Sequence, residues 1–173
     1  MRHIALLRGI NVGGKNSLPM RALTLFCTDL GAANVRTYIQ SGNVGLDLPP
    51  PLPATFARDL QARIARELGL TVPVVLRTLR ELQLTLQHNP WPALDPGTVH
   101  VAFLRDQPTA EQVARLEPDR SPPDTFLVRG SDVYLHTPGG LARSKLTNAW
   151  LDARLGTTAT IRNWRTVVAL AKL

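Results

Sequence analysis

The sequence predicts an α+β protein made of two tandem ferredoxin-like (β-α-β-β-α-β) subdomains with an extra C-terminal helix. Short apolar runs that end at glycine or proline indicate strands, and apolar residues spaced by three or four indicate the helices between them. The same order of elements then recurs in the second half of the chain. We therefore expect a first subdomain at 1–87 and a second at 98–173, joined by a proline-rich linker at 88–97.

The first half begins with a buried strand and a loop rich in glycine and asparagine. Pro19 is tolerated in the first turn of the helix after this loop, and Gly31 is positioned to end that helix. Ser41-Gly42 indicates a tight hairpin between two strands. Thr78 and Glu81 form a capping-box pattern at the start of a further helix. The elements expected before it are a strand at 2–8, a helix at 19–30, strands at 34–40 and 43–48, a helix at 52–68 and a strand at 72–77.

The second half repeats this order and adds one helix. Gly130-Ser131 predicts the turn between its two middle strands, and Asn163 is the expected cap of the last helix. Because the halves match in element order without visible sequence similarity, they suggest a duplication. The expected elements are a strand at 98–104, a helix at 109–116, strands at 125–129 and 132–136, a helix at 145–155, a strand at 157–162 and a helix from residue 163.

The composition is that of an ordinary globular protein, with 44% hydrophobic and 19% charged residues among 173. No apolar run approaches the roughly 20 residues that a membrane span needs. The single cysteine, Cys27, cannot form an internal disulfide and lies in phase with the apolar face of its helix, which indicates a buried thiol. These observations lead us to expect a cytoplasmic protein that does not bind membranes.

The formal charge of +7 is carried almost entirely by arginine, since the only lysines are Lys15, Lys145 and Lys172. Phosphate contacts dominate nucleic-acid binding and need such cations. The basic residues are spread along the chain, however, and aromatic residues are only 5%, which disfavours the stacking platforms that read RNA. We therefore expect at most weak, non-specific nucleic-acid binding that falls steeply with salt.

Two segments near the N-terminus are distinctive: Leu-Leu-Arg-Gly-Ile-Asn-Val-Gly-Gly-Lys-Asn at 6–16 and Tyr-Ile-Gln-Ser-Gly-Asn-Val at 38–44. Together with the segments at 133–136, 143–149 and 162–167, they resemble a bacterial family catalogued as a domain of unknown function, DUF1697. The resemblance covers nearly the whole chain and implies a fold of two α+β subdomains, with no catalytic assignment. Gly45 departs from the pattern, because a bulkier strand residue is expected there.

Gly9 to Asn16 reads G-x-x-x-x-G-K-N and lies between a strand and a helix, as a phosphate-binding P-loop would. A P-loop needs a hydroxyl at its last position to hold Mg²⁺, and Asn16 has none. Pro19 also suggests that the helix begins downstream of the glycines. We therefore expect no metal-dependent nucleotide hydrolysis, whereas the glycine loop still allows backbone amides to turn toward an anion.

Topology predicts which loops meet. In a β-α-β-β-α-β unit the third strand lies between the first two, antiparallel to both, so the loop after the first strand shares an edge with the hairpin after the second. The exits of the third and last strands of the second unit share an edge likewise. The resulting anion-binding candidates are Asn11, Gly13, Gly14, Lys15, Asn16, Ser41 and Asn43 in the first unit, and Arg143, Ser144, Lys145, Arg162 and Arg165 in the second.

The four histidines are scattered and lack metal-ligand spacing, so we expect no metal site and no cofactor. No sequence signature of a nucleophile with its base is present, and catalytic residues stay unassigned. The sequence leaves three functions open. The first is an anion-binding module for a phosphate-bearing small molecule, nucleotide or nucleic acid; the second is a small enzyme acting on an anionic metabolite; the third is a protein-interaction module. The oligomeric state is undetermined.

Overall fold

The computed structural model describes residues 1–173 and contains two compact units. The first unit consists of Met1–Leu82 together with Leu170–Leu173, and the second of Gln83–Ala169. Each unit contains one four-stranded antiparallel sheet and its own helices. The segment 88–97 therefore lies within the second unit, and the last four residues of the chain lie in the first. No helix combines the length and the apolar character that crossing a membrane would require.

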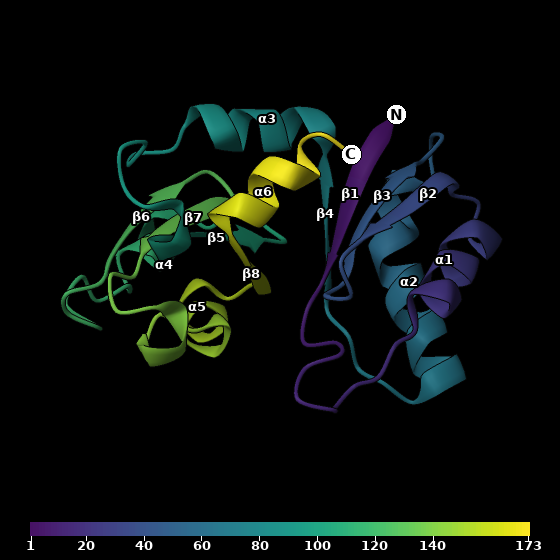
Figure 1. Ribbon diagram of the computed structural model, residues 1–173, viewed down its shortest axis with the longest axis horizontal. Helices are drawn as coiled ribbons and strands as arrows, with labels where there is room; N and C mark the ends of the chain where they lie inside the picture. Colours follow the sequence, from purple (N-terminus) through teal and green to yellow (C-terminus); the bar gives the residue numbers. More distant parts are fainter. The chain divides into compact units, whose positions relative to one another are not determined.

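The sheet of the first unit has the strand order β2-β3-β1-β4. β3 lies between β1 and β2 and runs antiparallel to both, which is the predicted arrangement. α1 and α2 cover one face of this sheet, as Figure 1 shows. The elements are β1 (Arg2–Leu7), α1 (Met20–Asp29), β2 (Ala33–Tyr38), β3 (Asn43–Asp47), α2 (Pro53–Leu68) and β4 (Val74–Thr78).

The core of the first unit forms between this sheet and its two helices. Phe56, Leu60 and Ile64 of α2 repeat every four residues and are fully buried, because that spacing places them on one helix face. Cys27 is buried in the same core, and burial raises the pKa of its thiol to about 12. The predicted interpretation of Cys27 as a structural thiol is confirmed, since a protonated and inaccessible thiol is a poor nucleophile.

The second unit has the equivalent strand order, β6-β7-β5-β8. Its core packs α4 and α5 against one face of the sheet around Trp150, Leu151 and Leu155. The strands β6 and β7 span the residues that were predicted for them. The elements are β5 (Val99–Leu104), α4 (Ala110–Val113), β6 (Thr125–Arg129), β7 (Asp132–His136), α5 (Asn148–Leu155) and β8 (Ala159–Asn163), with short 3-10 turns η1 (Pro96–Thr98) and η2 (Leu141–Arg143).

Two helices of the second unit are shorter than predicted. α5 begins at Asn148 rather than at residue 145, because Thr147 and not Ser144 supplies the cap: the Thr147 hydroxyl accepts from the Trp150 N–H at 3.2 Å. α4 is a single turn that ends at Val113 instead of reaching residue 116. Turns follow at Ala114 and Arg115, and Pro118 disfavours helical conformation only at Glu117, the residue before it.

Two further helices, α3 (Leu79–Gln87) and α6 (Trp164–Leu170), carry the chain across the unit boundaries. The predicted capping box of α3 is confirmed, because the Glu81 N–H donates to the Thr78 hydroxyl and the Thr78 N–H donates to the Glu81 carboxylate. The predicted cap of α6 is also present, since the Asn163 side chain accepts from the Arg165 N–H.

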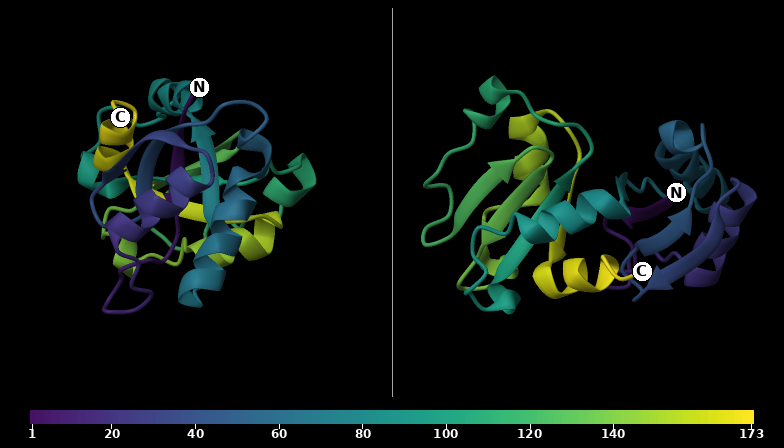
Figure 2. Two further views of the ribbon diagram at one scale, coloured as in Figure 1. Left: turned by 90° about the vertical axis from the view of Figure 1, so that its right-hand side faces the viewer. Right: turned by 90° about the horizontal axis from the view of Figure 1, so that it is seen from above.

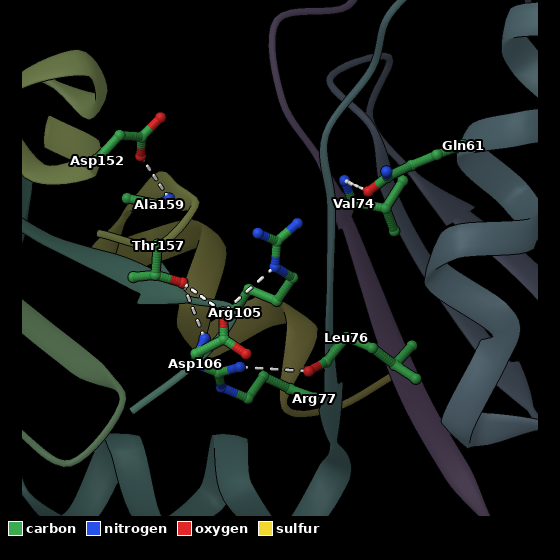
Figure 3. A network of polar contacts seen from close by, with 9 residues as sticks. All are labelled: Gln61, Val74, Leu76, Arg77, Arg105, Asp106, Asp152, Thr157 and Ala159. Carbon is green, nitrogen blue, oxygen red and sulfur yellow. Dashed lines mark hydrogen bonds and ion pairs between the residues drawn. The ribbon is translucent and has the colours of Figure 1, made fainter. Parts of the chain in front are cut away.

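Two kinds of hydrogen bond occur at equivalent positions within each unit, and the sequence alone does not predict them. The last amide of the first strand donates to the carbonyl of the next hairpin in both, from Leu7 to Gly42 at 2.8 Å and from Leu104 to Ser131 at 2.9 Å. In each unit a side chain of the second helix also accepts from the first N–H of the last strand. Gln61 accepts from Val74 at 2.8 Å in the first unit, and Asp152 accepts from Ala159 at 2.7 Å in the second (Figure 3).

Candidate anion-binding site

The glycine-rich loop after β1 forms a small hairpin that projects from the end of the first sheet, as Figure 1 and the left view of Figure 2 show. Val12 and Lys15 pair across it, and Gly13 and Gly14 occupy the two turn positions with φ values of 56° and 75°. Positive φ at both central residues defines the type I′ turn that suits a tight hairpin. The glycines therefore serve a β-turn, and α1 begins only at Met20, unlike the helix that starts within a P-loop.

Two asparagines hold the base of this hairpin in place. The Asn11 side chain donates to the Leu18 carbonyl at 2.9 Å and to the Gln40 carbonyl at 2.8 Å, and its oxygen accepts from the Leu18 N–H at 2.8 Å. The Asn16 side chain donates to the Gly9 carbonyl at 2.8 Å. Both residues adopt positive φ, at 53° and 52°, which asparagine tolerates better than most residues. Sequence reasoning missed this structural role, although loops rich in asparagine and glycine are a known signal for such backbone conformations.

The loop between β2 and β3 lies at the same edge, as the topology predicted. Gly42 is required there, because a Cβ atom on it would approach the Leu7 Cβ to 2.7 Å and its φ is +80°. Asn43 is buried and donates to the Ser41 hydroxyl at 2.8 Å and the Tyr38 carbonyl at 3.3 Å. Ile39 has a φ of 49°, an uncommon conformation for a β-branched residue, and its side chain is 55% exposed.

The predicted residues of the first unit therefore meet, but they divide into two groups. The side chains of Asn11 and Asn43 hold the two loops, and the Asn16 side chain donates to the Gly9 carbonyl although the residue is exposed. Gly13 and Gly14 donate no amide hydrogen bond within the chain, and both are exposed together with Lys15. The atoms presented to solvent at the tip are thus two backbone N–H groups and one ammonium group.

Charge distinguishes this edge from the equivalent edge of the second unit. Residues 8–17 and 38–43 contain Arg8 and Lys15 but no aspartate or glutamate. In the second unit Asp106 follows β5, where Gly9 follows β1. Its carboxylate lies 3.4 Å from the Arg105 Nε and accepts from the Thr157 hydroxyl at 2.9 Å (Figure 3). The second edge is therefore internally neutralised, whereas the first is cationic.

The anion-binding candidates predicted for the second unit follow strands that end at the same end of the sheet, because β7 and β8 both finish opposite the start of β5. The loop after β7 is held to the loop before β6 by the Lys145 N–H, which donates to the Ser121 hydroxyl at 2.9 Å. Ser144 is buried, and its oxygen accepts from the Leu146 N–H instead of capping α5. The side chains of Arg143 and Lys145 are exposed.

The two arginines near the end of β8 have other neighbours. The Arg162 guanidinium donates to the Thr160 hydroxyl at 2.8 Å and to the Ile161 carbonyl, and burial lowers its pKa to about 10. Arg165 lies 3.7 Å from the Asp95 carboxylate. None of these contacts joins either arginine to the loop at 143–145. The predicted single cationic cluster is thus divided among different partners, and the edge of the first unit is the stronger candidate.

The histidine, cysteine and acidic side chains form no group of three or more that could hold a metal ion. Tyr134 is buried beneath the second half of α3, where its hydroxyl donates to the Thr85 carbonyl at 2.7 Å. Burial raises the pKa of this phenol above its ordinary value. It serves as a structural donor, and no nucleophile with an adjacent base accompanies it.

The fold and this edge together define an α+β protein with two topologically equivalent units, of which the first carries a pair of loops joined by asparagine hydrogen bonds. The chain belongs to the family described as "Protein of unknown function (DUF1697)", whose family model matches residues 1–134. The match includes the whole of the first edge, whereas the similar segments at 143–149 and 162–167 lie beyond it. No curated protein matches the chain.

A solved structure has the same fold over nearly the whole length. It is described as the conserved bacterial protein SP0830 from Streptococcus pneumoniae. It is 24% identical, the alignment covers 99% of this chain and 97% of that one, and the TM-score is 0.75. At this level of identity the similarity establishes the fold alone.

Proposed function

We propose that this protein is an anion-binding module whose ligand carries a phosphate group, bound at the edge formed by residues 8–17 and 38–43. The observation that carries the proposal is the tip of the glycine loop, where Lys15 and two unused glycine amides are exposed and where residues 8–17 and 38–43 include no carboxylate. Backbone N–H groups in a turn and a nearby ammonium group are common partners of phosphate oxygens. The asparagine framework supports binding, because it orders the loops before a ligand arrives.

We also propose the ferredoxin-like topology for both units and a cytoplasmic location for the protein. The strand orders β2-β3-β1-β4 and β6-β7-β5-β8, each with two helices on one face, support the first assignment. The buried, reduced Cys27 supports the second.

Binding at this edge should be weak for a lone phosphate, because Lys15 and the turn glycines are fully open to solvent and salt screens such contacts. A larger ligand would gain from the apolar side chains nearby. Val12 is 64% exposed and Ile39 is 55% exposed, and each lies in one of the two loops. This observation favours a second candidate, in which the edge docks an acidic, partly apolar protein segment.

The test is a titration of ¹⁵N-labelled protein with inorganic phosphate, pyrophosphate, ATP and a short single-stranded oligonucleotide. We expect the amide signals of Gly13 and Gly14 to move most. Lys15→Ala should weaken the strongest of these ligands several-fold. Lys172→Ala is the matched control, because it removes the same charge from another exposed position of the first unit.

The proposal fails if the Gly13 and Gly14 signals do not move with any of the four ligands, or if the two lysine variants have equal effects. An acidic peptide that shifts the signals of Val12 and Ile39 when none of the phosphate compounds does would support the protein-docking alternative instead.

A further inference from the structure

A second polar site lies in the first unit, on the face of the sheet opposite α1 and α2. It is an open pocket of about 370 Å³, lined by Arg2, Asn34, Arg36, Asp47 and Leu173. Ala5 and Leu7 of β1 and Val44 and Leu46 of β3 pack in the helix-side core. Because side chains alternate along a strand, Arg2 and Asp47 face the other side. None of these residues belongs to the loop edge described above.

Arg2 lines this pocket, and only 18% of its side chain is exposed. Its Nε donates to the Leu173 carbonyl at 3.2 Å, and its Nη1 donates to the Asn34 carbonyl at 2.8 Å and lies 3.5 Å from the Asp47 carboxylate. Its Nη2 makes no hydrogen bond. This nitrogen lies over Gly45, only 2.8 Å from where a Cβ atom on that residue would stand.

Arg36 is the second cation and approaches from the neighbouring strand. It is the cross-strand partner of Gly45, and the strand register shifts between Ala33 and Arg36, at a β-bulge. Asn34 within this bulge has a φ of 50° and donates to the Asp47 carboxylate at 2.7 Å. Bulges of this kind re-aim side chains and are frequent beside binding sites. Arg36 is exposed and makes no ion pair or hydrogen bond within the chain.

The absence of a side chain at Gly45 leaves room for the Arg2 guanidinium group, which forms one side of the pocket. The equivalent residue of β7 is Tyr134, which fills the corresponding place in the second unit and is buried. The positions equivalent to Arg2 and Arg36 are Val99 and Leu127, so the second unit has no such pair of cations. The departure at Gly45 therefore coincides with a site that only the first unit possesses.

We propose that this pocket binds the oxyanion group of a small ligand, a carboxylate or a phosphate, between the guanidinium groups of Arg2 and Arg36 above Gly45. Asp47 is the acidic side chain of the pocket, and its pKa is lowered chiefly by the hydrogen bond from Asn34, so it stays ionised beside Arg2. The unpaired guanidinium group of Arg36 and the Nη2 donors of Arg2 remain for a ligand. Guanidinium groups bind carboxylates and phosphates in a bidentate manner, which suits this geometry.

The test uses isothermal titration in a buffer free of carboxylate and phosphate, with inorganic phosphate and citrate as separate probes. Arg36→Gln should weaken binding of the preferred probe by about 10- to 100-fold, the loss expected for a bidentate charge-assisted contact. Arg66→Gln is the control, because Arg66 is an exposed arginine of α2 in the same unit with 68% of its side chain exposed. It should leave binding unchanged.

Gly45→Ala provides a variant without a change in charge. Its Cβ would displace the flexible end of Arg2 and press on Leu173, at 3.2 Å, so we expect a folded protein that binds the probe several-fold more weakly. Lys15→Ala should not alter binding at this pocket, which separates this inference from the loop site. The inference is overturned if neither probe binds, or if Arg36→Gln and Arg66→Gln weaken binding equally. Preference for citrate or for phosphate identifies the ligand class.

Discussion

The first and second units share one strand order but differ in the connection that leaves their first strand. In the first unit the connection from β1 to α1 spans residues 8–19 and folds into a hairpin of its own, and α1 has 10 residues. In the second unit residues 105–109 suffice, and α4 has only 4 residues. The cores are similar in construction, and this connection is one of the differences between the units. The two units show that one sheet topology can carry connections of different length and structure at the same edge.

The comparison also distinguishes the contacts that both units have from the features that only one unit has. The amide contacts of Leu7 and Leu104, and the helix side chains Gln61 and Asp152, perform equal tasks in both units. The asparagine framework, and a glycine at position 45 with Arg2 lying over it, occur in the first unit alone. We therefore propose that both candidate binding sites lie in the first unit, since the second unit has neither feature.

The largest expected effect tests whether the two cores are independent. Leu60 of α2 and Leu151 of α5 are both fully buried and occupy the second helix of their units. Either leucine changed to alanine should cost about 2–5 kcal/mol of unfolding free energy. Hydrogen exchange should rise mainly in residues 1–82 for Leu60→Ala and in 83–169 for Leu151→Ala. An equal rise in both units with either variant would show one cooperative core.

A smaller loss is expected at the framework that only the first unit has. Asn11→Ala removes three hydrogen bonds. It also places alanine, which tolerates a positive φ less well than asparagine, at a φ of 53°. At about 1 kcal/mol for each bond, the cost should be about 2–3 kcal/mol. Asn16→Ala removes a single bond and should cost about 1 kcal/mol. Urea unfolding followed by circular dichroism measures both, and equal values would mean that Asn11 does not anchor the loops.

The cap of α5 should contribute about 1 kcal/mol, the usual value for such a hydroxyl. α2, its counterpart in the first unit, begins at Pro53, and its N-cap residue Leu52 offers no side-chain hydrogen bond, so this contribution belongs to the second unit only. Thr147→Ala should raise hydrogen exchange at the Trp150 amide, whereas Ser144→Ala should leave that amide protected. The opposite result would restore the sequence-based start of α5 near residue 145.

The smallest expected effect is a pH dependence in the second unit. His100 is buried, its Nδ1 has no hydrogen-bond partner, and burial lowers its pKa below the ordinary 6.5. Because the folded-state pKa is the lower one, the unfolded chain takes up the proton more readily, and stability is lost as the pH falls from about 6.5 toward the folded pKa. At pH 6 the loss should stay below about 1 kcal/mol, since that pH is only half a unit below the ordinary value.

Tryptophan fluorescence measures this effect selectively, because Trp91, Trp150 and Trp164 all lie in the second unit. Urea midpoints at pH 7 and pH 6 should differ for the unchanged protein and coincide more closely for His100→Gln. A midpoint difference that persists fully in the variant would assign the pH dependence to another group.

Periodicity and turn residues were enough to predict every strand and the order of the helices, because strands bounded by glycine or proline leave little ambiguity. The start of α5 was wrong because Ser144 and Thr147 are both good caps, and only the packing of Leu146 and Trp150 decides between them. The meeting of the two loops in the first unit could be predicted from topology alone. Contacts that depend on tertiary distance could not be predicted, such as Arg2 lying over Gly45.

The return of residues 170–173 to the first unit has a consequence for synthesis on the ribosome. β1, β2, β3 and β4 all leave the exit tunnel before the second unit does, yet Leu173, which supports Arg2, is made after it. The first sheet can therefore assemble early, whereas the pocket beside Arg2 is completed only once translation has passed through the whole second unit. A nascent chain would display the loop edge well before it could display the arginine pocket.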